Sequence, residues 1–164
     1  MTKESYLKIT GLIREDPKKI RLVRSTNQLL TRFVFLLYPI FLFLLLLQKN
    51  PHFLRAILVP AISFVAVTVF RKVVNVPRPY EKFDMPPVLE KDTKGKSFPS
   101  RHVFSIFIIA MSIFYIHTGS GILLFIAGTV LAVLRVIGGV HEPRDVIAGA
   151  LIGILSGIIG FYII

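Results

Sequence analysis

The sequence contains no cysteine, which excludes disulfide bonds and thiolate metal sites. Acidic residues are scarce: 9 Asp and Glu stand against 20 Lys and Arg, and the formal net charge is +11. The first 28 residues also lack the apolar core of a cleavable signal peptide, so none is expected. In a soluble protein this excess of basic residues would suggest nucleic acid as the partner. In a chain with long apolar runs it instead suggests anionic lipid headgroups, membrane topology and a phosphate site.

Apolar residues are abundant and occupy 54% of the 164 positions. The predicted fold class is all-α, a polytopic membrane helical bundle of about five transmembrane helices, in one integral membrane domain over 1–164. Several runs are shorter than the roughly 20 residues that cross a hydrocarbon core of about 30 Å, so we expect tilted helices or helices that include flanking residues. The apolar runs cover 33–47, 53–70, 103–116, 122–134 and 146–164.

The N-terminal segment, 1–28, mixes apolar and charged residues and contains Pro17. This composition predicts two short amphipathic segments on the membrane interface, ahead of a transmembrane core over 29–164. A partly disordered basic tail is the alternative. Near the other end of the chain, glycine recurs at every fourth position between 149 and 157. This spacing of small residues predicts close packing of the last helix against a neighbour inside the bundle.

Three polar clusters stand at the edges of the apolar runs, where ionisable groups are costly and suggest a function. The second and third runs are joined by a polar, proline-rich link, so both of its ends lie on one side of the membrane. The third and fourth runs form a hairpin, which returns the chain to that side. Span parity therefore brings the three clusters to one face. The clusters are Arg71, Lys72 and Arg78; Pro99, Ser100, Arg101 and His102; and Arg135, His141 and Asp145.

The same parity places the N-terminus on the side of the clusters and the C-terminus on the other side. Eighteen Lys and Arg residues then lie on the cluster side, whereas the other side has only Lys49 and Arg55. An excess of Lys and Arg in loops marks the cytoplasmic side of a membrane protein. We therefore predict a multi-pass protein of the cell membrane whose polar clusters face the cytoplasm.

The third cluster has the spacing of a nucleophile and its orienting group. His141 and Asp145 are four residues apart at the start of the last run, so they share one helix face. The carboxylate can accept from one ring nitrogen and leave the other with a free lone pair. Arg135, six residues earlier, is expected on the same face. An interfacial ion-pair group of Arg135, Glu142, Arg144 and Asp145 is the alternative, and in either case Glu142 and Arg144 are expected to be solvated.

The second cluster precedes the third run. A helix that starts there presents free N–H groups and the positive end of its dipole to an anion. Ser100 is a natural N-cap whose hydroxyl could instead bind a phosphate oxygen, and His102 in the first turn could transfer a proton near neutral pH. Purely structural roles for this serine and histidine are the alternative.

The first cluster supplies guanidinium groups. Arg71 and Arg78 can each bind phosphate oxygens in a fork, and the prolines on both sides of Arg78 hold it on a stiff, extended segment. Lys72 can contribute a further cation or act only as an anchor at the membrane surface. Several fixed cations with two imidazoles and one carboxylate suit the transfer of a phosphoryl group.

The three clusters resemble the three-part signature of the type 2 phosphatidic acid phosphatase superfamily, which includes lipid phosphate phosphatases and the soluble vanadium haloperoxidases. Order, spacing and placement beside the apolar runs all match, over roughly residues 50 to 164. The resemblance implies that His141 attacks phosphorus, that Asp145 orients it and that His102 protonates the leaving oxygen, with no metal or cofactor. The phosphate would be held by Arg71, Arg78, Ser100, Arg101 and Arg135, with Lys72 as the alternative to Arg71.

The chain departs from the family pattern at three positions. Arg71 stands where the family usually has lysine, Arg101 replaces the usual glycine, and Leu134 replaces a common serine. Family members commonly have six spans, and this chain is expected to lack the first, which moves the site to the inner face of the membrane. The linker over 81–96, rich in charge and proline, is expected to form a mobile rim or lid over the site.

With that orientation, the resemblance implies an enzyme that hydrolyses the terminal phosphate of a lipid. Phosphatidylglycerophosphate, made on the inner leaflet, is the first candidate, with phosphatidylglycerol as the product. Undecaprenyl pyrophosphate, if the site faces outward, and phosphatidic acid are the alternatives. A non-catalytic phospholipid-binding protein is an alternative of another class, but binding alone would not require His102, His141 and Asp145. No nucleic-acid partner is expected, and the oligomeric state is not predicted.

Overall fold

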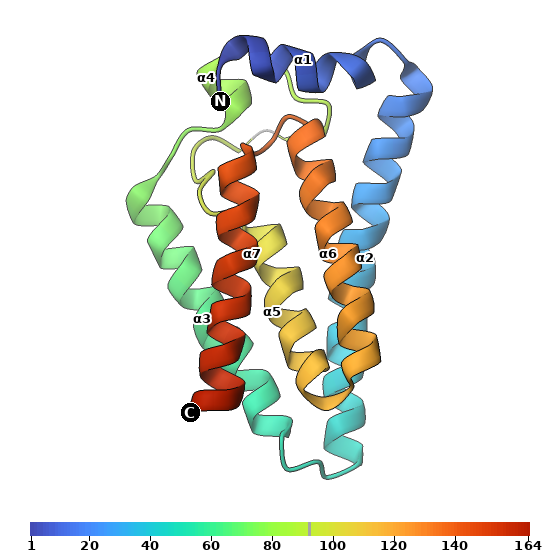
Figure 1. The fold of residues 1–164 in the computed structure, drawn as a ribbon, viewed down its shortest axis with the longest axis vertical. Helices are drawn as coiled ribbons and strands as arrows, with labels where there is room; N and C mark the ends of the chain where they lie inside the picture. The colour runs from blue at the N-terminus through green and yellow to red at the C-terminus, as the bar shows by residue number, and fades with distance from the viewer. Residues whose placement is uncertain (92) are drawn as a thin grey trace.

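The structure, a computed structural model, describes residues 1–91 and 93–164, and every regular element in these residues is helical. Five long helices form a bundle, and an N-terminal helix lies across one end of it (Figure 1). This confirms the predicted all-α fold class. The elements are α1 (Lys3–Arg14), α2 (Pro17–Leu47), α3 (Phe53–Val74), α4 (Pro79–Lys82), α5 (Arg101–Ile116), α6 (Thr118–Ile137), α7 (Pro143–Ile158) and a final π-helical turn, η1 (Ile159–Ile163).

Four of these helices, α2, α3, α6 and α7, are long and apolar enough to cross a membrane. Their outward faces carry large apolar side chains, such as Phe35 on α2 and Ile62 on α3, which are 71% and 66% exposed and suit contact with lipid. The fifth predicted span, α5, has only 16 residues, about 24 Å at a rise of 1.5 Å per residue. It lies among the other helices and is the most buried of them, so the bundle is built around a short central helix.

Close packing of α7 against α5 depends on the glycines predicted to face a neighbour. A Cβ atom on Gly149 would lie 2.6 Å from the carbonyl oxygen of Ser100, and one on Gly157 would lie 2.5 Å from the Cβ of Met111. No side chain fits at either distance, so both positions require glycine. The predicted packing within the bundle is confirmed, and it brings the first turn of α7 against the start of α5.

The N-terminal segment differs from its prediction in one respect. Only α1 is a separate amphipathic helix, because α2 runs without a break from Pro17 into the apolar run that ends at Leu47. Asp16 caps this helix by accepting from the backbone N–H of Lys18 at 2.8 Å, and proline is tolerated in a first helical turn. Pro17 therefore starts the helix instead of separating two short ones. The disordered tail that was the alternative is wrong as well.

Helix α1 is fastened to two loops at the end of the bundle. The hydroxyl of Tyr6, fully buried, donates to the carbonyl oxygen of Gly139 in the α6–α7 turn at 3.4 Å. Arg14, at the other end of α1, donates to the carbonyl oxygen of Pro86 in the α4–α5 linker. The helix thus covers the end of the bundle where these two loops meet (Figure 1).

The arrangement of chain ends agrees with the predicted parity. The N-terminus, α4 and the α6–α7 turn lie at one end of the bundle, and the C-terminus with the α2–α3 and α5–α6 turns lies at the other (Figure 1). The start of α5 is set deeper in the bundle than the adjoining ends of α6 and α7 (Figure 1). The polar clusters therefore share one end of the bundle.

Candidate active site

His141 and Asp145 are held at the start of α7. Pro143 begins the helix, and the Asp145 side chain accepts from the backbone N–H of Glu142 at 3.0 Å, as an acidic residue in a first turn can. His141 Nδ1 lies 3.5 Å from Asp145 Oδ2, and each side chain is only 1% exposed. The pair predicted from its four-residue spacing is present. Burial lowers the pKa of His141 below its usual range, despite the opposing effect of Asp145, so the imidazole is neutral.

Arg78 faces the other nitrogen of the same ring. Its Nη1 lies 3.4 Å from His141 Nε2 and donates to the carbonyl oxygen of Val140 at 3.2 Å, while its Nε donates to that of Gly95 at 3.1 Å. The backbone around Arg78 is extended, as its proline neighbours predict, and α3 ends at Val74, followed by Asn75 in a left-handed conformation. An anion that meets Nε2 of His141 would therefore also meet a guanidinium group.

Arg71 is buried at the end of α3, but its guanidinium group is already occupied by protein. It donates to the carbonyl oxygens of Lys96 and Pro99 and, at 3.3 Å, to that of Ser97. Arg71 thus holds the loop that leads into α5. Lys72 is exposed whereas Arg71 beside it is buried, because adjacent helical residues lie about 100° apart around the axis at 3.6 residues per turn. Phosphate binding by Lys72 therefore stays a prediction.

Two buried hydrogen-bond donors of the site have polar atoms without a partner among the described residues. Arg135, on α6, donates only from Nη1, to Asn27 at 3.4 Å, and its Nε and Nη2 have no partner among the described residues. Ser100 is completely buried just before α5, and its hydroxyl likewise has no partner there and does not cap the helix. Buried polar groups are normally paired, so each one left over calls for a physical reason. A bound anion would satisfy both.

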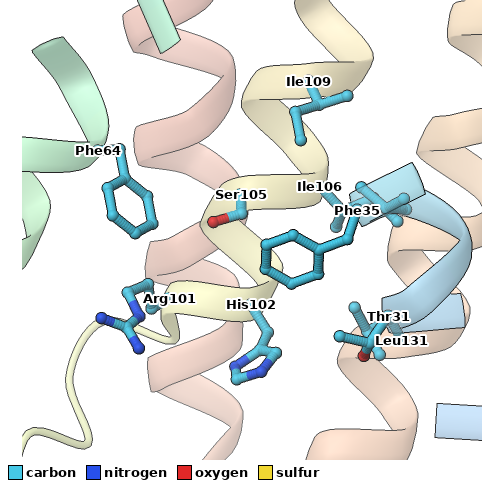
Figure 2. Close-up of a pocket in the computed structure, with 10 residues that line it drawn as sticks. Thr31, Phe35, Phe64, Arg101, His102, Ser105, Ile106, Ile109 and Leu131 are labelled. Carbon is cyan, nitrogen blue, oxygen red and sulfur yellow. The ribbon is translucent and has the colours of Figure 1, made fainter. Parts of the chain in front are cut away.

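Arg101 and His102 lie at the mouth of an adjoining apolar cavity of about 150 Å³. The exposed guanidinium group of Arg101 lies 5.6 Å from the ring centre of Phe64 on α3, a cation–π contact. His102 is half-buried, within electrostatic range of Arg135 and His141. Figure 2 shows both side chains at one end of the cavity, with Ile109 at the other end.

Glu142 corrects one expectation: it is buried and not solvated. Its carboxylate pairs with the α-amino group of Met1 at 3.3 Å, with Lys82 at 3.4 Å and with Arg144 at 3.0 Å. The chain ahead of α1 and the short helix α4 thus cover Glu142, directly ahead of α7. Arg144 is exposed, as predicted. The alternative ion-pair group is present only in part, because no contact joins Arg135 to it among the described residues.

The linker over 81–96 also differs from the expected mobile rim, although residue 92 lies outside the described residues. It is held at several points, among them Leu89 N–H to the carbonyl oxygen of Gly138 at 3.1 Å and Arg24 Nε to that of Val88 at 2.8 Å. It also carries Lys91 toward the site. Burial and the nearby guanidinium groups of Arg78, Arg135, Arg101 and Arg71 lower the pKa of Lys91, a further basic residue that the sequence did not single out.

Ser97 is the second residue that the sequence reasoning missed. Its buried hydroxyl donates to Asp145 Oδ2 at 2.6 Å and lies 3.4 Å from His141 Nδ1. The available signal was its place two residues before Pro99, at the edge of the second cluster. No group of three or more His, Asp or Glu side chains that could hold a metal ion occurs in the described part of the chain.

These features agree with the comparisons to known proteins. The family model of the PAP2 superfamily matches residues 52–164, which contain all three clusters. The chain belongs to the PAP2 superfamily. The resemblance found in the sequence is thereby confirmed, and phosphatase chemistry is supported at the level of the family.

Among PAP2 relatives, the solved structure of Aquifex aeolicus LpxE has a TM-score of 0.74 and 27% identity, over 96% of this chain and 92% of that one. A phosphatidylglycerolphosphate phosphatase from Bacillus subtilis shares the fold, with a TM-score of 0.72, 20% identity and coverage of 96% and 83%. The Bacillus licheniformis bacitracin transport permease protein BcrC is 33% identical over 105 residues, or 62% of this chain. This chain spans about half of the length of BcrC, 52%.

Proposed function

We propose that this chain is a metal-independent lipid phosphate phosphatase that works through a phosphohistidine. The observation that carries the proposal is the pair of buried groups without partners, Arg135 and Ser100, beside a neutral, carboxylate-held His141. Nε2 of His141 attacks phosphorus, and His102 gives a proton to the leaving oxygen as the ester bond breaks. Water then attacks the phosphohistidine and returns a proton to His102, the P–N bond breaks, and inorganic phosphate leaves.

The guanidinium groups divide into two kinds in this proposal. Arg78 and Arg135 bind the phosphate oxygens directly. Ser100 and the exposed Arg101 bind the remaining phosphate oxygens. Arg71 supports them through the loop that it holds, since its donors are taken by backbone carbonyl oxygens. The charge that develops on the transferring phosphoryl group is thus met by groups already in position.

An apolar groove beside the site supports a lipid as the substrate. The cavity at Arg101 and His102 continues into a second one of about 290 Å³ between α2 and α3, and the two share Ser105 and Ile109 on α5. Aromatic side chains, Phe35 and Phe64, flank the groove (Figure 2). A lipid chain can lie in this groove while its phosphate reaches the basic end, as expected of a site that joins an apolar wall to a few polar groups.

Among lipid phosphates, we favour phosphatidylglycerophosphate. This choice follows from the predicted cytoplasmic orientation, because that lipid is made on the inner leaflet. Release of inorganic phosphate should be measured on detergent-solubilised protein in excess chelator, with phosphatidylglycerophosphate, phosphatidic acid and undecaprenyl pyrophosphate compared. We expect turnover in chelator and the highest kcat/KM for the first lipid. A preference for another lipid would replace this substrate, and no turnover of any would favour a binding protein instead.

Orientation can be measured separately, because the chain has no cysteine of its own. Lys94 is exposed at the site end of the bundle, and Lys49 is exposed at the opposite end. In intact cells, a membrane-impermeant thiol reagent should label the Lys49→Cys variant and leave Lys94→Cys unlabelled until the cells are opened. Labelling of Lys94→Cys alone in intact cells would reverse the proposed orientation.

The groove makes a further prediction. Ser105→Phe places a ring in both cavities, so kcat/KM for a long-chain lipid phosphate should fall by about tenfold, whereas a water-soluble short-chain phosphate ester should be hydrolysed at the wild-type rate. Ile126→Phe, on the outward face of α6 where residue 126 is 57% exposed, adds similar bulk outside the groove and should change neither rate. Equal losses on both substrates would argue against the groove as the chain site.

A further inference from the structure

Ser97 occupies an unusual place between the proposed nucleophile and its carboxylate. The direct separation of His141 Nδ1 and Asp145 Oδ2 is 3.5 Å, longer than a good hydrogen bond. Ser97 Oγ lies 2.6 Å from the same carboxylate oxygen and 3.4 Å from the same ring nitrogen. The residue is 1% exposed, so no solvent competes for its hydroxyl.

The direction of these contacts follows from what each group can donate. A carboxylate only accepts, so the single hydroxyl proton of Ser97 points to Asp145. The lone pairs of the Ser97 hydroxyl then face Nδ1 of His141. For a neutral His141 ring to donate to this hydroxyl, Nδ1 must carry the ring proton. Nε2 is left with the free lone pair, on the side of the ring where Arg78 lies. The serine therefore selects the tautomer that can attack phosphorus.

The loop that carries Ser97 is held from both sides. The backbone N–H of Ser97 donates to the carbonyl oxygen of Val76 at 2.8 Å, and its own carbonyl oxygen accepts from Arg71 Nη1 at 3.3 Å. Arg71 thus helps to fix the position of Ser97. This gives Arg71 a role that does not require contact with phosphate.

We propose that Ser97 is a positioning residue for the phosphatase reaction: its hydroxyl accepts a hydrogen bond from Nδ1 of His141, donates one to Asp145, and so holds the histidine as the reactive tautomer. The proposal rests on the proposed function. Asp145 acts partly through this hydroxyl, and its Oδ2 accepts from both Ser97 and the backbone N–H of Glu142. Chemistry with phosphate remains on Nε2.

Ser97→Ala should lower kcat by about 10- to 100-fold and leave KM nearly unchanged, because a positioning group acts on the chemical step. Ser97→Thr retains the hydroxyl and should recover most of the rate. Ser112→Ala removes an equally buried serine hydroxyl farther along α5 and is expected to have no effect on kcat. Should the alanine variant fail to fold, Ser97→Cys offers a weak donor of similar size and should have an intermediate rate.

Nitrogen NMR of histidine-labelled protein provides a readout that does not depend on turnover. In wild type, the His141 signals, assigned by their loss in His141→Ala, should be those of a neutral ring protonated at Nδ1, and in Ser97→Ala this tautomer should lose population. An unchanged tautomer together with a kcat within about threefold of wild type would overturn the role of Ser97. Absence of lipid hydrolysis by the wild type would instead reject the proposed function. The tautomer of His141 would still test the hydrogen bonds that Ser97 makes to His141 and Asp145.

Discussion

His141→Ala is expected to lower the rate of lipid phosphate hydrolysis by about 10⁴-fold or more, the largest effect of any substitution in the chain. Alanine removes the atom that bonds to phosphorus, and no other described histidine can reach the same position with a carboxylate behind it. The rates of wild type and variant should be measured as released inorganic phosphate under conditions where wild type gives a linear progress curve.

A trapping experiment separates loss of the nucleophile from loss of the fold. Wild-type protein quenched in base after brief exposure to labelled substrate should carry phosphate in an acid-labile bond, and His141→Ala should carry none. His117→Ala is the matched control, because His117 caps α6 at the opposite end of the bundle. Labelled phosphate on the His141 variant, or a loss of rate in the control equal to that in His141→Ala, would contradict the assignment.

His102→Ala should have the second largest effect, a loss of about 10²- to 10⁴-fold on lipid substrates. The leaving group of a lipid phosphate is a poorly acidic alcohol, which requires a proton as the P–O bond breaks. A phosphate ester of a nitrophenol leaves without one, so its hydrolysis should fall far less. The ratio of the two rates therefore measures the role of His102 as the acid.

The control for this comparison is His141→Ala, in which both substrates should lose activity together. Each rate should be determined at saturating substrate, since His102 also lines the groove and its removal can change KM. A loss in His102→Ala that is the same for both substrates would show that the residue positions phosphate instead of donating a proton.

Part of this site could be predicted from sequence because its geometry is local. His141 and Asp145 face each other because a helix brings positions four apart together, and the spacing alone contains that information. The convergence of the clusters on one end of the bundle followed from counting spans, which needs no knowledge of packing. Arg78 was predictable for a similar reason, since the prolines beside it determine its backbone.

The parts that were missed depend on contacts between distant segments. Ser97 reaches Asp145 only because α5 and α7 pack closely, and Glu142 is buried only because the chain ahead of α1 and α4 cover it. Lys72 shows the opposite case: its type fits a phosphate site, but it is exposed on α3 while its neighbour Arg71 is buried. Residue type and spacing do not determine which face of a helix is covered by a segment far away in the chain.

The short central helix has a consequence for kinetics. Because α5 begins deeper than the ends of α6 and α7, the backbone at its start lies below the rim of the bundle (Figure 1). For the proposed lipid substrate, we expect entry by sideways diffusion in two dimensions, without departure from the bilayer. The velocity should follow the mole fraction of substrate in the membrane, so that inert lipid slows the enzyme at constant bulk concentration.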